Sequence, residues 1–115
     1  MEESTTIPGE VTVEPDVLEI IAWHSAMEVP GVVQIERDAV EEFFSGKPVS
    51  IVVQNGQVTI DLHIMAAPDQ SLLQLGRKVQ YEVTRAVQNM IGMPVAACHV
   101  HIEDVLYPPS EPSEK

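Results

Sequence analysis

Three of the four histidines lie on stretches in which apolar and polar residues alternate. Alternate residues of a strand share one face of a sheet, so His99 and His101 point to the same side. His63 alternates in the same way with Asp61, and Glu103 follows His101. Imidazole and carboxylate groups are ligands of zinc, nickel and iron. His63, His99 and His101 therefore form a candidate metal site. The alternative is that they lie on a sheet face that binds no metal and is either open or covered by a partner.

No other residue set points to a reaction. The sequence has no Gly-rich phosphate loop, no Gly-x-Ser-x-Gly motif and no His-Glu-x-x-His motif. The single cysteine, Cys98, excludes an internal disulfide. Its alternation places it on the apolar side of a strand, where a thiol is inert core rather than a nucleophile. We therefore expect no enzymatic activity and no cofactor.

A second candidate surface is the polar arc of a helix predicted over 70–91. This arc carries three of the six basic residues around an aromatic ring. Arg and Tyr are favoured at protein interfaces. The polar arc consists of Arg77, Lys78, Tyr81 and Arg85. It is either a solvated outer face of the helix or a contact patch for an acidic partner. The opposite, apolar arc is expected to pack on a sheet and consists of Leu72, Leu75, Val79, Val83, Ala86, Val87 and Met90.

A helix predicted over 15–29 is apolar on two sides. Ile20, Trp23 and Met27, spaced i, i+3 and i+7, form one stripe, and smaller residues form another on nearly the opposite side. Such a helix is buried on both sides, and one sheet covers only one of them. Exposed apolar patches usually mark association sites, so the Ile20, Trp23 and Met27 stripe is a candidate contact with another chain. The alternative is cover within the chain, by the second helix or by residues 38–46.

The 115-residue chain is strongly acidic, and its charge is unevenly distributed. Eighteen Asp and Glu against six Lys and Arg give a net charge of -12. Residues 1–42 hold eleven acidic and one basic residue, whereas 43–92 hold three acidic and four basic residues. Binding to phosphate backbones and anionic lipid rests on Lys and Arg, so we expect no nucleic-acid partner. The opposite charges favour a homo-oligomer in which the 1–42 segment of one copy meets the basic helix of another.

The elements that position these residues alternate between strands and helices. Asn55-Gly56 joins two β-branched runs, which is the strongest short-range hairpin signal, and we expect positive φ at both residues. The predicted order is β-α-β-β-β-α-β, with residues 38–46 a short helix or a loop. The strands are placed over 10–13, 31–37, 49–54, 57–66 and 95–105. This order predicts an α+β fold: a two-layer α/β sandwich with two helices on one face of a mixed sheet of about four strands.

The two ends differ in composition from the chain between them. Residues 1–8 are polar with one proline, and 107–115 contain three prolines. We therefore expect a flexible N-terminal tail, a single domain over 9–106 and a disordered Pro-rich C-terminal tail. No apolar run approaches the roughly 20 residues of a membrane span, and the start lacks the basic and apolar regions of a signal peptide. These features predict a cytoplasmic protein without direct membrane insertion.

Much of the chain between the tails is similar to one bacterial family. The resemblance is carried by residues 9–22, 28–32, 52–62, 79–80, 86–92 and 100–105. On these segments the chain resembles the alkaline shock protein twenty-three family, also called the Gls-twenty-four or envelope stress response family. The shared features are apolar positions, glycines and a turn rather than catalytic residues. The family's usual last strand is of the Val-Asn-Val type, where this chain has Cys98-His-Val-His-Ile102, so any role of the histidines is particular to this chain.

The resemblance implies a non-enzymatic cytoplasmic protein with a role in cell-envelope stress and cell-wall homeostasis. It also implies that the protein can lie at the inner face of the membrane, through a membrane-anchored partner protein. Our first hypothesis is therefore an interaction or scaffold protein that self-associates or binds a partner. The alternative is a metal-binding module that uses the histidines. A small RNA-binding domain is the weakest hypothesis, because the basic surface is limited and the predicted sheet lacks base-stacking aromatics.

Overall fold

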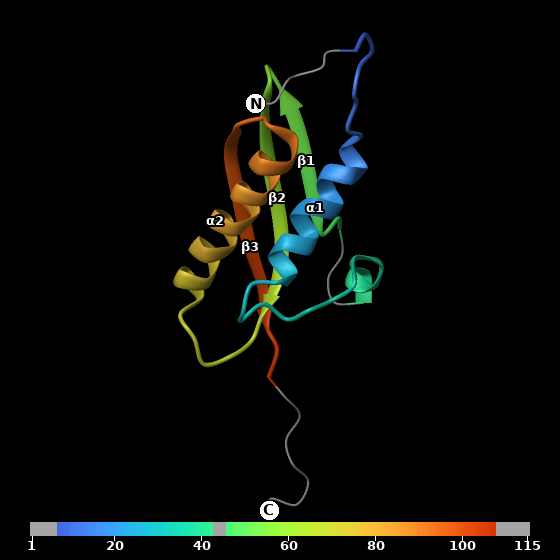
Figure 1. Cartoon of the computed structure of the whole chain (residues 1–115). Coiled ribbons are helices and arrows are strands. Elements are labelled where there is room, and N and C mark those ends of the chain that lie inside the picture. Colours follow the sequence, from blue (N-terminus) through green and yellow to red (C-terminus); the bar gives the residue numbers. More distant parts are fainter. Residues whose placement is uncertain (1–6, 43–45, 108–115) are drawn as a thin grey trace, which may run out of the picture.

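Two helices lie side by side on one face of a three-stranded sheet (Figure 1). The computed structural model describes residues 7–42 and 46–107, so the two predicted tails fall almost entirely outside the described residues. The elements are, in chain order, α1 (Pro15–Met27), the 3-10 helix η1 (Arg37–Glu42), β1 (Val49–Gln54), β2 (Gln57–Ala66), α2 (Leu72–Ile91) and β3 (Val95–Val105). The predicted α+β class with two layers is confirmed.

The sheet has the strand order β1-β2-β3 and is mixed. β1 and β2 form the predicted antiparallel hairpin, in which Asn55 has φ 52° and Gly56 has φ 74°. Positive φ at both turn residues matches the right-handed twist of the flanking strands, which is why Asn-Gly is favoured there. β2 and β3 run parallel, because α2 carries the chain back over the sheet between them.

Residues 31–37 do not form the predicted strand. Pairing in this segment is limited to a single antiparallel bridge between Val32 and Ala66. The chain then turns toward α1, where the backbone N–H and C=O of Ile35 bond to side chains of α1. Because the N–H and C=O of Ile35 already have hydrogen-bond partners, pairing with a neighbouring strand would give them no further hydrogen bonds. Arg37 already belongs to η1, so the short-helix alternative for 38–46 is observed for residues 38–42, whereas 43–45 lie outside the described residues.

Residues 10–13 are also not a strand, although Val11 and Val13 alternate with polar residues as predicted. No strand lies beside them in the described part of the chain, and Val11 is 96% exposed. The sheet built from residues 7–42 and 46–107 therefore has three strands rather than about four.

The helix α2 packs on the sheet through the middle of its predicted apolar arc. Leu75, Val79, Val83 and Val87 are buried. Leu72 and Met90 were expected on the same buried face, but they are 38% and 67% exposed. Both lie in the terminal turns of α2 and border surface clefts, Leu72 beside β3 and Met90 beside the end of α1. The ends themselves follow the sequence signals: the Ser71 Oγ accepts from the N–H of Gln74, and Gly92 has φ 74°.

The core lies between the helices and the central strand. Val58, Ile60, Leu62 and Ile64 of β2 are all 0% exposed. α1 contacts α2 and β1, and α2 contacts β3. The opposite face of the sheet carries the polar residues of each strand, and no helix or strand of the described residues covers it (Figure 1).

Candidate interaction surfaces

The three candidate metal ligands share the open face of the sheet. In the parallel register His63 lies beside His101, and Asp61 lies beside His99. The rings of His63 and His101 stack with their centroids 4.6 Å apart. Each ring pairs with a carboxylate on the neighbouring strand. His63 Nδ1 lies 2.5 Å from Glu103 Oε2, and His101 Nε2 lies 3.3 Å from Asp61 Oδ1.

This geometry is that of two cross-strand histidine–carboxylate pairs. Stacked imidazoles present their faces, not their nitrogen lone pairs, to each other, whereas a metal needs several nitrogens converging on one point. Among the described residues, no group of three or more His, Cys, Asp or Glu could hold a metal ion. The arrangement thus gives the metal-binding alternative no support.

Cys98 lies on the helix side of β3, partly buried against the core, as the alternation predicted. Burial raises the pKa of its thiol from 9.0 to about 11, and a hydrogen bond with Thr84 opposes the shift. The thiolate is the reactive form of cysteine. The raised pKa therefore fits a structural thiol.

The thiol is expected to react slowly and to make the protein less stable in alkali. At about pH 8 its thiolate fraction is about 100-fold smaller than in the unfolded chain, so a thiol-specific reagent should react about 100-fold faster in denaturant. The pKa of the thiol is higher in the folded protein than in the unfolded chain. The protonated thiol therefore contributes fully to the stability of the fold below pH 9.0, and this contribution is lost as the pH rises through about 11. Cys98→Ser is the control that lacks this loss. A folded thiol that titrates near 9.0 would contradict the assignment.

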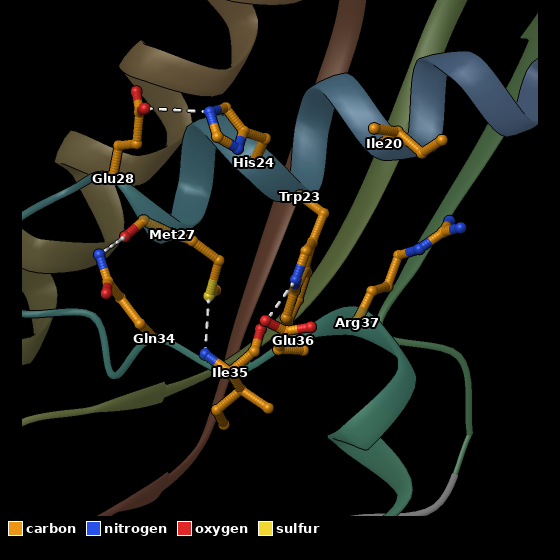
Figure 2. Close-up of a pocket in the computed structure, with 9 residues that line it drawn as sticks. All are labelled: Ile20, Trp23, His24, Met27, Glu28, Gln34, Ile35, Glu36 and Arg37. Carbon is orange, nitrogen blue, oxygen red and sulfur yellow. Dashed lines mark hydrogen bonds and ion pairs between the residues drawn. The ribbon is translucent and has the colours of Figure 1, made fainter.

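The Ile20, Trp23 and Met27 stripe is largely covered by the chain itself (Figure 2). Trp23 is 6% and Met27 9% exposed, whereas Ile20 is 51% exposed. The cover is the 34–37 segment: Trp23 Nε1 donates to the carbonyl of Ile35 at 3.1 Å, and Met27 Sδ accepts from the N–H of Ile35 at 3.4 Å. Of the two alternatives for this stripe, contact with another chain is therefore not needed to bury Trp23 and Met27. Cover within the chain is observed, although by a different segment from those expected.

A cleft of about 550 Å3 remains between α1 and the 34–37 segment. Trp23 lies deep in it, and the exposed Ile20 stands at its rim (Figure 2). His24 Nε2 and Glu28 Oε2, 3.0 Å apart, border its other end. The cleft offers an apolar floor with a polar rim, the usual composition of a contact site.

Glu19 is a buried acid that the sequence reasoning did not single out. It is 7% exposed. Lys47 Nζ lies 3.0 Å from its Oε2, and Arg37 Nη1 lies 3.5 Å from its Oε1. In the sequence, the one indication that Glu19 is buried was its position directly after the apolar residue Leu18. The two cations attach α1 to η1 and to the residues that precede β1, so this carboxylate is structural.

The predicted basic residues lie on the outer surface of α2, which we call the α2 face (Arg77, Lys78, Tyr81 and Arg85). Tyr81 is 63% exposed, and the Arg85 guanidinium carbon lies 6.0 Å from its ring centroid. The hydrogen bond and the charge of Glu82 raise the pKa of Arg85. Arg77, Tyr81 and Arg85 line one shallow cleft. Lys78 lies on another side of the helix, in a second cleft of about 520 Å3 that also includes the exposed Met90, Ser25 of α1 and residues 28–30.

A further groove lies between α2 and β3, which we call the α2/β3 groove. Its volume is about 370 Å3, and its lining residues are Leu72, Leu73, Gly76, Arg77, Gln80, Val100 and Ile102. Leu73 is 70% exposed. Sequence reasoning missed this groove because its two walls are far apart in the chain. The one available signal was Leu73, an apolar residue outside the buried arc of its helix.

In the described part of the chain, neither helix combines the length and the apolar content that a membrane crossing requires.

A model of the alkaline shock protein twenty-three family, described as having a cell envelope-related function, matches residues 3–107. Two curated relatives match at similar identity. An uncharacterized protein from Streptococcus pyogenes serotype M6, Spy1535, is 26% identical over 108 residues, which cover 90% of this chain and 84% of the relative. The uncharacterized protein YqhY of Bacillus subtilis is 26% identical over 114 residues, which cover 93% of this chain and 84% of the relative.

Solved structures of MamM-CTD have a similar fold. One of them, MamM-CTD 215-293, superposes with a TM-score of 0.50 at 18% identity, covering 77% of this chain and 96% of that one. A variant of the same domain has a TM-score of 0.52 at 18% identity, with 79% and 98% coverage. At this identity the likeness concerns the arrangement of helices and strands alone.

Proposed function

The chain belongs to the alkaline shock protein twenty-three family, which has a cell envelope-related function, and on this premise we propose that it is a non-catalytic interaction protein in cell-envelope homeostasis. It acts by self-association or by binding a partner protein. The observation that carries the proposal is the α2 face, where basic and aromatic side chains are exposed together on a chain of net charge -12.

The α2 face has the composition of a protein contact surface. Tyr81 is 63% exposed, and Arg77 and Arg85 line the same shallow cleft. Lys78 lies in the neighbouring cleft, beside Met90, which is 67% exposed. Arg and aromatic residues are enriched in interfaces, where they supply large contact areas with polar ends. The basic charge selects an acidic partner.

A second copy of the chain is one such partner. Residues 1–42 carry a net charge of -10, from eleven acidic residues and one basic residue. Opposite charges on two surfaces of one molecule steer encounter and fix orientation more than they add affinity. The other partner we propose is a membrane-anchored protein, which places this chain in the cytoplasm at the inner face of the membrane.

Neutralising the α2 face is expected to weaken self-association in a salt-dependent way. Arg77→Gln combined with Arg85→Gln removes two positive charges, and we expect the dissociation constant to rise about tenfold at low ionic strength. At high salt the difference should shrink, because exposed charges are then screened. Sedimentation equilibrium at two salt concentrations measures both effects.

The control is Gln54→Glu combined with Gln57→Glu, at the exposed hairpin. It changes the net charge by the same amount away from the α2 face. If this control weakens association as much as the arginine variant, general repulsion is responsible and the α2 face is not the contact. An arginine variant that associates like wild type at low salt would rule the face out directly.

A further inference from the structure

β3 is an edge strand with an open outer side. It has one strand neighbour, β2, among the described residues, so about half of its backbone groups face away from the sheet. Side chains bond to three backbone groups of β3. Gln88 Oε1 accepts from the N–H of Val95 at 3.0 Å. Gln80 Nε2 donates to the carbonyl of Cys98 at 3.0 Å, and Asp104 Oδ1 accepts from the N–H of Val105 at 2.8 Å. Residues 100–102 lie between these two points.

The α2/β3 groove lies over this stretch of β3. Val100 and Ile102 line it and are partly exposed, although their register partners on β2, Leu62 and Ile64, are 0% exposed. The groove is open at Gly76, because a Cβ at this position would meet nothing within 4 Å. An apolar groove beside an open strand edge is the arrangement that binds an added strand: the edge supplies backbone hydrogen bonds, and the groove receives alternate side chains.

Residues 9–14 have the sequence of a strand and no strand beside them in the described chain. Val11 is 96% and Val13 41% exposed. They alternate with polar residues, including Glu10 and Glu14. In an extended conformation the two valines share one face and the two glutamates the other.

We propose that residues 9–14 of one copy add as a fourth strand to β3 of a second copy, with Val11 and Val13 in the α2/β3 groove. The inference rests on the self-association proposed above and names its contact. Six extended residues span about 20 Å, enough to cover the open part of the edge. The two glutamates then point to the open face of the sheet, beside His99 and His101.

The positions of the segment and the groove favour a second copy over folding back within one chain. Residues 9–14 lead into α1, which contacts β1, whereas the groove lies at the opposite edge, where α2 contacts β3 (Figure 1). Each copy has one segment to donate and one groove to fill, so the contact closes as a reciprocal two-fold dimer or continues head to tail in a longer assembly.

Filling the groove tests the proposal without endangering the fold. Gly76→Gln places a side chain in the groove and replaces the helix-weakening glycine by a good helix former, so the variant should melt at or above the wild-type temperature. We expect its dissociation constant for self-association to rise at least tenfold. Val11→Thr combined with Val13→Thr keeps the strand propensity, removes the apolar groups and should give the same loss. Val52→Thr, at a 49% exposed valine on β1, is the matched control and should associate like wild type.

Disulfide trapping then identifies the two sides of the contact. In a Cys98→Ser background, a Val11→Cys copy mixed with a Leu73→Cys copy should form a linked dimer under mild oxidation. A Val11→Cys copy mixed with a Val52→Cys copy should not, because Val52 lies on the opposite edge.

The outcomes separate this inference from the proposed function. A wild-type protein that stays monomeric contradicts self-association and the strand addition together. An oligomer that is unchanged by Gly76→Gln overturns the strand addition alone. Loss of association in Gly76→Gln but not in the Val11 and Val13 variant also overturns it, because a different element, such as β3 of the second copy, then occupies the groove.

Discussion

Replacing Val83 by Asp is expected to unfold the protein. Val83 is 0% exposed and lies at the centre of the buried face of α2. A carboxylate there has no basic partner and loses its hydration, and burying an unpaired charge costs at least about 4 kcal/mol. The total stability of a domain of this size is only about 5–15 kcal/mol. We therefore expect a melting temperature lowered by about 15 °C or more, or no cooperative transition, by circular dichroism.

Val52→Asp is the matched control for this substitution. Val52 is 49% exposed on β1, opposite Thr59 in the antiparallel register. A carboxylate there stays hydrated and should cost less than about 1 kcal/mol. A Val83→Asp protein that melts like the Val52→Asp protein would show that α2 buries a different face.

Replacing Trp23 by Ala is expected to cost about 3–5 kcal/mol. The indole is 6% exposed, and its Nε1 donates to the carbonyl of Ile35. The substitution leaves a cavity between α1 and the 34–37 segment and removes the partner of a buried carbonyl. Because the contact lies within one chain, the loss should appear as lower stability to urea at an unchanged oligomeric state.

Two variants divide this effect into its parts. Trp23→Phe keeps most of the ring and removes the N–H, so it should cost less than the alanine variant, with about 1 kcal/mol from the lost hydrogen bond. Ile20→Ala changes the exposed neighbour and should cost less than about 1 kcal/mol. If Trp23→Ala keeps its stability but dissociates an oligomer, Trp23 contacts another chain instead of the 34–37 segment.

The hairpin and the middle of α2 were predictable because their signals are local. Asn55-Gly56 requires the positive φ that a tight hairpin turn needs, whatever the rest of the chain does. The periodicity of α2 identifies Val79 and Val83 as buried. It does not indicate how far the sheet extends under the helix, and for that reason Leu72 and Met90 were wrongly placed in the core.

Residues 31–37 and Trp23 were misjudged for one shared reason. The β-branched run at 32–35 has the composition of a strand, but Ile35 gives its backbone hydrogen bonds to side chains of α1. The partner of each group lies several residues away and belongs to a different element. Composition and periodicity do not reveal such a contact. The same contact covers Trp23, so the periodicity of α1 could not decide between contact with another chain and cover within this one.

For the surface histidines, the sequence predicted their placement on the sheet but not their chemistry. Alternation placed His63 and His101 on one face, and the structure confirms this placement. The register between β2 and β3 then decides their chemistry, because it stacks the rings and pairs each with a carboxylate. Register in a parallel pair is set by the crossover helix and the core, which the histidines do not influence.

The mass of the wild-type protein in solution tests the interaction account most directly. Sedimentation equilibrium from micromolar to near-millimolar concentration, at low salt, compares the average mass with that of one chain. The account predicts a mass that rises above the monomer value with concentration and falls back when salt is added. A mass equal to one chain at every concentration and salt level would contradict self-association.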